Sequence, residues 1–176
     1  MNPNIKYIIR AILLILVQYI LSSMLPLGGY ITPYIYYAFV LWLPFNIGKN
    51  WLLLVAAAYG LFIGYLTLMP GLNAAACVLI AYLRPFILSL LLPKEANQMN
   101  YQEPSITSMG FTSYSIYIII LTLVHHCFLF FLQLLSVGHF GYFFVKIILS
   151  TLISLLLLAI TEIIFVRAKK TRASLN

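Results

Sequence analysis

Charged side chains are scarce in this sequence. Only 7% of its 176 residues are charged, and Asp and Glu together number 3, whereas about a quarter of the residues in a typical soluble domain are charged. Hydrophobic residues make up 64% of the chain, so the composition predicts an integral membrane protein. The shortage of carboxylates argues against an enzyme, as does the lack of a Gly-rich phosphate loop or of a serine or cysteine nucleophile beside an orienting base.

Cysteine is almost as rare. Cys77 and Cys127 both fall inside apolar runs and have no C-x-x-C spacing, which argues against a disulfide framework or a cysteine zinc site. A free cysteine behaves as a small hydrophobe, so we interpret both as packing residues. We expect no metal and no cofactor.

The basic residues show no pattern that suits a nucleic acid. The net charge is +7, but the lysines and arginines are scattered or lie at the C-terminus, and no basic face carries interleaved aromatics. Lys6 and Arg10 flank the first apolar run and the tail 167–176 is basic, so the positive-inside rule predicts that both termini are cytoplasmic. No A-x-A-like site follows the first run, which we interpret as a retained helix rather than a signal peptide.

Hydropathy predicts an all-α fold, a single-domain bundle of six transmembrane helices. The weakest of them is 33–45, which is short for a bilayer that takes about 20 residues per helix. An even number of crossings supports this span, because five crossings would place the basic tail on the other side of the membrane from Lys6 and Arg10. The predicted spans are 7–25, 33–45, 51–69, 72–92, 114–135 and 142–166, with a cytoplasmic loop at 93–113.

The aromatic residues around the second predicted span suggest interfacial belts, which form where amphipathic rings meet the headgroups. Four tyrosines would lie toward its outer end and one tryptophan near its inner end: Tyr30, Tyr34, Tyr36, Tyr37 and Trp42.

Small residues recur every fourth position on the third predicted span, at Ala56, Gly60 and Gly64. They lie on one face, where a neighbouring helix can approach closely. We expect this face to pack within the chain, with a partner protein as the alternative. The Pro70-Gly71 dipeptide predicts a tight turn to the next span.

Arg84, followed by Pro85, lies inside an apolar run, and an ionisable group at that depth needs a partner. One reading is a structural arginine whose head snorkels toward water. The sharper hypothesis is a buried ion pair with Glu162, which is the carboxylate that falls within a predicted span.

His125 and His126 lie near the middle of the fifth predicted span. Adjacent helical positions point about 100° apart, so the two rings cannot jointly ligate one ion as i, i+4 histidines do. We expect one ring to hydrogen-bond across a helix interface and the other to line a polar crevice. Gln18, Thr67 and Asn73 could line a small pocket near the outer face.

A family resemblance extends over nearly the whole chain. It rests on GLFIGYLTLMPGLNAAACVLIAYLRPFIL from Gly60, EPSITSMGF from Glu103, VHHCFLFFLQ from Val124 and ITPYIYYAFVLWLPF from Ile31. In order and spacing these stretches resemble the MreD family of rod-shape-determining membrane proteins, most closely its Bacteroidetes-type members. The matching positions are Pro70, Gly71, Arg84, Pro85, His125 and His126. Relatives commonly carry aspartate at the position of Gly64 and histidine at that of Asn73, so no role of those residues is carried over.

The resemblance implies a non-enzymatic subunit of the bacterial cell-elongation complex in the inner membrane. Such a protein binds MreC and, through it, links MreB filaments to the lateral-wall peptidoglycan synthase. It also implies a fold like that of the substrate-binding S components of vitamin-type uptake transporters. An S component is the alternative function, although it needs small residues for docking on the first span, where this chain has only Ala11 and the Ser22-Ser23 pair.

Overall fold

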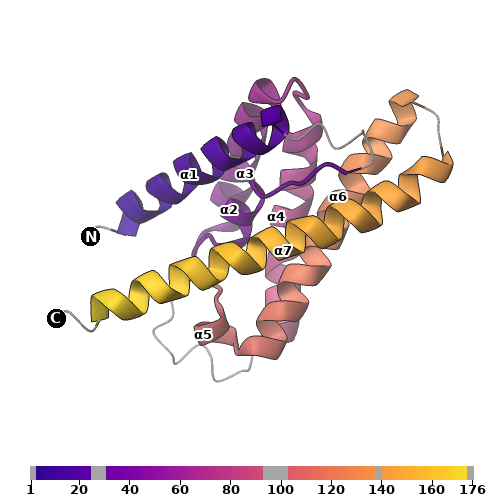
Figure 1. The fold of residues 1–176 in the computed structure, drawn as a ribbon. Coiled ribbons are helices and arrows are strands. Elements are labelled where there is room, and N and C mark those ends of the chain that lie inside the picture. Colours follow the sequence, from indigo (N-terminus) through magenta and orange to yellow (C-terminus); the bar gives the residue numbers. More distant parts are fainter. Residues whose placement is uncertain (1–2, 25–30, 93–102, 138–139, 174–176) are drawn as a thin grey trace.

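A computed structural model describes the backbone of residues 3–24, 31–92, 103–137 and 140–173, and the side chains of 5–23, 31–92, 103–134 and 143–163. In these ranges the regular elements are all helices (Figure 1). Five of the described helices are long and apolar enough to cross a membrane, as expected for a membrane protein. The long helices are α1 (Pro3–Met24), α3 (Lys49–Leu66), α4 (Leu72–Leu91), α6 (Phe111–Val137) and α7 (Phe140–Ala173), and the short ones are α2 (Ala38–Leu41) and α5 (Ile106–Met109).

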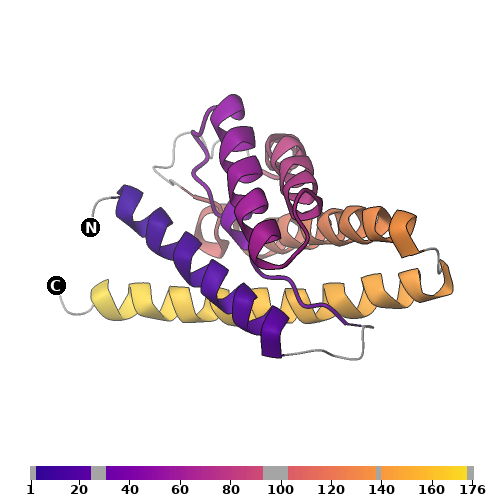
Figure 2. The same ribbon diagram turned by 90° about the horizontal axis from the view of Figure 1, so that it is seen from above.

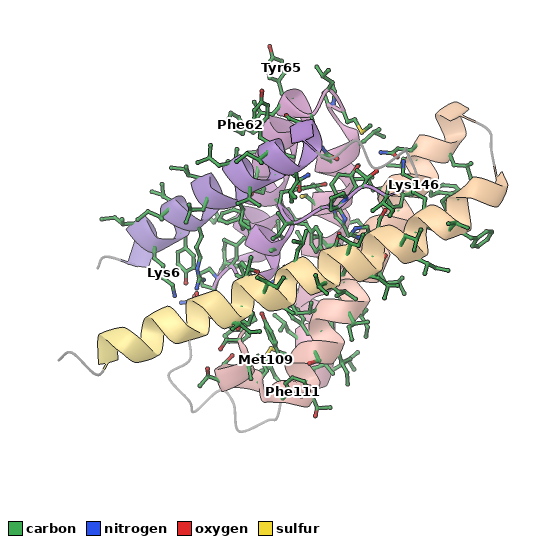
Figure 3. The ribbon with its side chains drawn as sticks, in the orientation of Figure 1. Lys6, Phe62, Tyr65, Met109, Phe111 and Lys146 are labelled. Atoms are coloured by element: carbon green, nitrogen blue, oxygen red, sulfur yellow. The ribbon has the colours of Figure 1, made fainter. Side chains whose placement is uncertain are left out.

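The helices pack in a chain of neighbours. α3 packs on α4, α4 on α6, and α6 on α7, while α1 contacts the short helix α2. Both described ends of the chain lie on one side of the molecule, and the end of α6 and the start of α7 lie on the other (Figures 1 and 2). Long apolar side chains cover the outside. Phe62 and Tyr65 project from α3 away from the bundle (Figure 3), as expected for a surface in contact with lipid.

The small-residue face of α3 packs within the chain, as expected. A methyl group at Gly60 would lie 2.6 Å from the Cα of Ala74, and one at Gly64 would lie 2.7 Å from the carbonyl oxygen of Met69. Ala56 is fully buried on the same face. The predicted turn is also present, with Gly71 at φ +85°, a conformation that glycine adopts without the steric cost of a Cβ. Close packing therefore occurs inside the α3–α4 hairpin.

The prediction of a spanning helix at 33–45 is wrong. Only Ala38–Leu41 is α-helical there, and turns or irregular backbone flank it. Tyr34, Tyr36, Tyr37 and Trp42 are each 3% exposed or less, so these rings belong to the core rather than to interfacial belts. Tyr30 lies outside the described residues. Hydropathy identified an apolar segment correctly but could not show that the rest of the bundle surrounds it.

Other boundaries differ by smaller amounts. The predicted loop at 93–113 contains α5, and α6 already begins at Phe111; residues 93–102 lie outside the described part. Ser105 caps α5 in a capping box with Ser108, which satisfies N–H groups at the helix start. α7 continues to Ala173, so the backbone of the predicted tail is helical over most of its length. Pro85 lies inside α4, which continues past it.

Candidate functional site

The most polar region of the interior surrounds residues 31–45, here called the central segment. Every residue from Pro33 to Leu43 is buried, yet only Ala38–Leu41 is α-helical there. A buried peptide group without a partner costs free energy, and inside a bilayer irregular backbone is tolerated only where protein or a water-filled cavity surrounds it. The side chains that satisfy this backbone therefore define the site.

The first half of the central segment is held by α1 and α7. The Gln18 carboxamide accepts from the backbone N–H of Ile35 at 2.8 Å and donates to the carbonyl of Pro33 at 3.3 Å. From the other side, Ser150 and Ser154 of α7 accept from the backbone N–H groups of Thr32 and Tyr34, both at 3.0 Å. Three side chains thus replace the neighbouring strand or helical turn that this backbone lacks.

The two histidines lie against the central segment from α6, and both are fully buried. His125 Nε2 lies 2.9 Å from the Tyr36 hydroxyl, and its ring stacks on Tyr37 with centroids 4.4 Å apart. His126 Nδ1 lies 2.9 Å from the Thr122 carbonyl and its Nε2 lies 3.0 Å from Ser154 Oγ.

The partners of His126 fix its tautomer. A carbonyl can only accept, so Nδ1 carries the proton that is shared with Thr122, and in the neutral ring Nε2 is then an acceptor. The Ser154 hydroxyl donates to Nε2 while its oxygen accepts from Tyr34 N–H. His126 therefore joins α6 to α7, as expected for one of the two rings. His125 is buried against the non-helical part of the central segment, so the expectation that the second ring lines a crevice is wrong.

Arg84 enters the second half of the central segment from α4 and is 2% exposed. Its guanidinium donates to the carbonyls of Leu43 and Pro44, and Nε donates to the Tyr117 hydroxyl at 3.1 Å. Tyr117 in turn donates to the carbonyl of Leu41 at 2.8 Å. The guanidinium thus supplies donors to backbone that has no helical partners.

The hypothesis of an Arg84–Glu162 ion pair is wrong. Glu162 accepts instead from the Tyr114 hydroxyl at 3.0 Å, and that hydroxyl accepts from the Trp42 indole N–H at 2.8 Å. The ion pairs of the described part of the chain involve Glu103, which contacts Lys6 at 2.5 Å and Arg10 at 2.7 Å. Glu103 therefore joins the segment before α5 to the start of α1, a contact that the sequence did not suggest.

The suggested outer pocket of Gln18, Thr67 and Asn73 is not formed. Asn73 donates to Thr67 Oγ1 at 2.9 Å within the α3–α4 hairpin, whereas Gln18 binds the central segment. The described residues include no group of three His, Cys, Asp or Glu side chains that could hold a metal ion. Cys77 and Cys127 are free thiols, with Cys77 buried.

Sequence reasoning identified Arg84, His125 and His126 as important polar residues but paired them incorrectly. It missed Ser150, Ser154, Tyr114 and Tyr117, because hydroxyl residues are common in membrane helices and nothing in their spacing distinguishes them. The short length of the central segment was the one sequence feature that pointed to such partners. An apolar run too short to cross as a helix needs external hydrogen-bond partners.

No protein-family profile, curated protein or solved structure matches this chain.

Proposed function

We propose that this protein is a non-enzymatic membrane subunit of the bacterial cell-elongation complex, of the MreD type, that binds MreC. Through MreC it would help couple MreB filaments to lateral-wall peptidoglycan synthesis. The proposal is supported by the contacts of the buried polar side chains, which are made within the chain. Residues in the motifs that carry the resemblance, among them Arg84, His125 and His126, bind the central segment or pack on it.

This arrangement favours a scaffold over a solute-binding protein. A transporter component needs polar groups turned toward a chamber for its ligand. Here Gln18, Arg84 and Ser154 are occupied by backbone groups, and Thr67 and Asn73 bond to each other. The buried polar side chains hold the helices together in one bundle. The apolar outer surfaces of the helices remain for contacts within the bilayer.

The central segment also supports the proposed topology. If the chain crosses the membrane there as buried irregular backbone, the five long helices and this segment make six crossings, as in an S-component-like fold. Both termini would then lie in the cytoplasm of the bacterium, in agreement with the basic residues at each end. The Lys6–Glu103 and Arg10–Glu103 ion pairs would lie at that same cytoplasmic face.

Purification in mild detergent from the native membrane tests the proposed function. A tagged chain is expected to recover MreC and the elongation synthase by mass spectrometry, and a mock purification from the untagged strain is expected to recover neither. Recovery of an ATPase pair with its transmembrane coupling subunit would instead support the S-component alternative. Recovery of neither set would contradict the proposal.

A further inference from the structure

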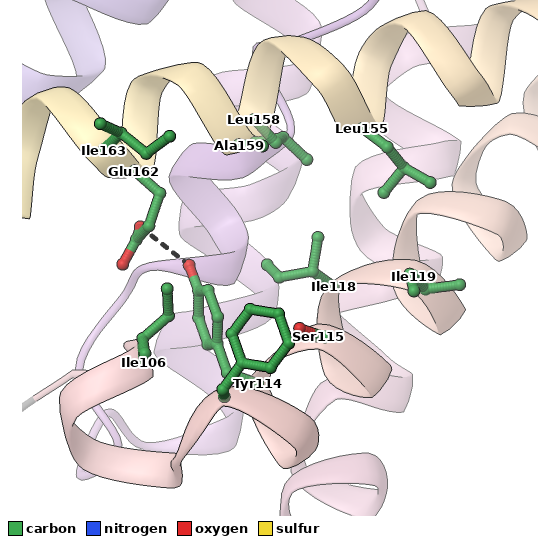
Figure 4. Close-up of a pocket in the computed structure, with 11 residues that line it drawn as sticks. Ile106, Tyr114, Ser115, Ile118, Ile119, Leu155, Leu158, Ala159, Glu162 and Ile163 are labelled. Carbon is green, nitrogen blue, oxygen red and sulfur yellow. Dashed lines mark hydrogen bonds between the residues drawn. The ribbon is translucent and has the colours of Figure 1, made fainter.

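A cavity of about 530 Å³ lies between α6 and α7 beside α5 (Figure 4). Its floor is buried and consists of Tyr114, Ile118 and Leu158. Its rim is exposed: Phe111, Ile119 and Ile163. Most of the lining is hydrocarbon and the rim faces outward, so in a membrane the cavity opens to the lipid. An empty space there would forfeit dispersion contacts along its walls.

The length of the cavity matches one leaflet. Its lining runs from Phe111 to Ile119 on α6 and from Leu155 to Ile163 on α7, which is about 12 Å along each helix at 1.5 Å per residue. Half of the hydrocarbon core measures about 15 Å. A transmembrane partner helix would need a groove along the full core, whereas a single acyl chain needs only this length.

A carboxylate marks the polar end of the cavity. Glu162 lies five residues before Arg167, the first basic residue of the tail, and Phe111 begins the candidate span Phe111–Leu134, so this end lies toward the headgroups. Glu162 accepts from the Tyr114 hydroxyl at 3.0 Å. A carboxylate offers about four lone-pair sites, and it can therefore accept from a further donor.

We propose that this cavity binds phosphatidylethanolamine, with one acyl chain between α6 and α7 and the headgroup ammonium donating to Glu162. An ethanolamine headgroup carries three N–H donors on a positive charge, whereas a choline headgroup has no N–H and a glycerol headgroup has no positive charge. The carboxylate therefore selects among lipids with identical tails. The proposal depends on membrane insertion of the chain and not on its place in the elongation complex.

Native mass spectrometry of the delipidated protein tests the site. The protein is incubated with equal amounts of phosphatidylethanolamine, phosphatidylcholine and phosphatidylglycerol that carry the same acyl chains. The wild type is expected to retain the ethanolamine lipid over the choline lipid by about tenfold, the ratio given by a charge-assisted hydrogen bond. Glu162→Gln is expected to bring that ratio near one, and Glu162→Asp to keep a clear preference.

Two phenylalanine variants separate the acyl site from the general lipid surface. Ala159→Phe fills the cavity from an exposed position and is expected to lower all lipid adducts, whereas Ala58→Phe, at an exposed alanine of α3, leaves them unchanged. An unchanged lipid ratio in Glu162→Gln, with thermal melting like that of the wild type, would overturn the proposal. So would loss of a co-purifying protein from Ala159→Phe with lipid adducts intact, because the occupant would then be a helix.

Discussion

A cation buried inside a membrane protein needs electron-rich partners, and at Arg84 these are oxygen atoms of the backbone and of one phenol. The choice follows from geometry. The guanidinium presents five N–H donors in a rigid fork, and the end of the central segment presents carbonyls that no helix satisfies. The N–H donors of Arg84 and the unpaired carbonyls of the central segment therefore satisfy each other, and no carboxylate is needed.

Arg84 and Tyr117 are expected to be coupled energetically, and Arg84 and Glu162 are not. Arg84→Met should lower the free energy of unfolding by about 1–3 kcal/mol, because it leaves buried carbonyls without donors. In double-mutant cycles, the cycle with Tyr117→Phe should give a coupling energy above about 0.5 kcal/mol, and the cycle with Glu162→Gln should be additive. Denaturant titration in detergent micelles measures both cycles. A larger coupling to Glu162 would restore the ion-pair hypothesis.

At the scale of elements, the central segment links four of the five long helices, and the fifth, α3, packs on α4. The segment contacts α1, α4, α6 and α7 through named hydrogen bonds, although α1 itself remains largely exposed. Gln18 is the link on the α1 side. A glutamine there both accepts and donates, and an apolar residue of similar size could do neither.

Gln18→Leu is therefore expected to loosen the central segment. The amides of Ile35 and Tyr36 lose their acceptor, so their hydrogen exchange should accelerate by at least about tenfold if a bond worth about 1.4 kcal/mol is lost. Gln133→Leu is the matched control, because Gln133 contacts Met69 and Lys146 near the surface. Hydrogen-exchange mass spectrometry in nanodiscs measures both variants. Equal exchange of these amides in the wild type and in Gln18→Leu would show that Gln18 does not hold them.

The α3–α4 hairpin gives a second prediction at this scale. Gly60→Ala forces its methyl group against the backbone of Ala74 at 2.6 Å and is expected to cost about 1–3 kcal/mol by overpacking. Gly48→Ala meets only Trp51 at 3.9 Å and should cost less than about 1 kcal/mol at the start of α3. Thermal unfolding of both variants measures the difference. Similar losses would argue against close packing at Gly60.

The long helices could be predicted from the sequence because each is an apolar run of membrane length, and the small residues at Ala56, Gly60 and Gly64 predicted close packing. The central segment could not, because hydropathy does not distinguish an apolar run that spans as a helix from one enclosed by the bundle. The partners of Arg84 were missed for a related reason. Backbone carbonyls carry no sequence signature, so a search among side chains found only Glu162.

At the scale of the whole molecule, the proposed topology predicts the side of the membrane that each end of the central segment reaches. If 31–45 crosses, Asn46 lies on the same side as the N-terminus, and Leu68, in the turn between α3 and α4, lies on the opposite side. Both residues are exposed. The positive-inside rule predicts that the N-terminus and Asn46 lie in the cytoplasm.

Single cysteines at Asn46, Leu68 and an N-terminal tag, in a Cys77→Ala, Cys127→Ala background, test this arrangement. A membrane-impermeant maleimide is expected to label Leu68→Cys in intact spheroplasts and to label Asn46→Cys and the tag only in inverted vesicles. This labelling is expected because, in the proposed topology, the central segment returns the chain to the side of the membrane on which α1 begins. Labelling of Asn46→Cys and the tag from opposite sides would mean five crossings, with the central segment enclosed by the bundle but not carrying the chain across.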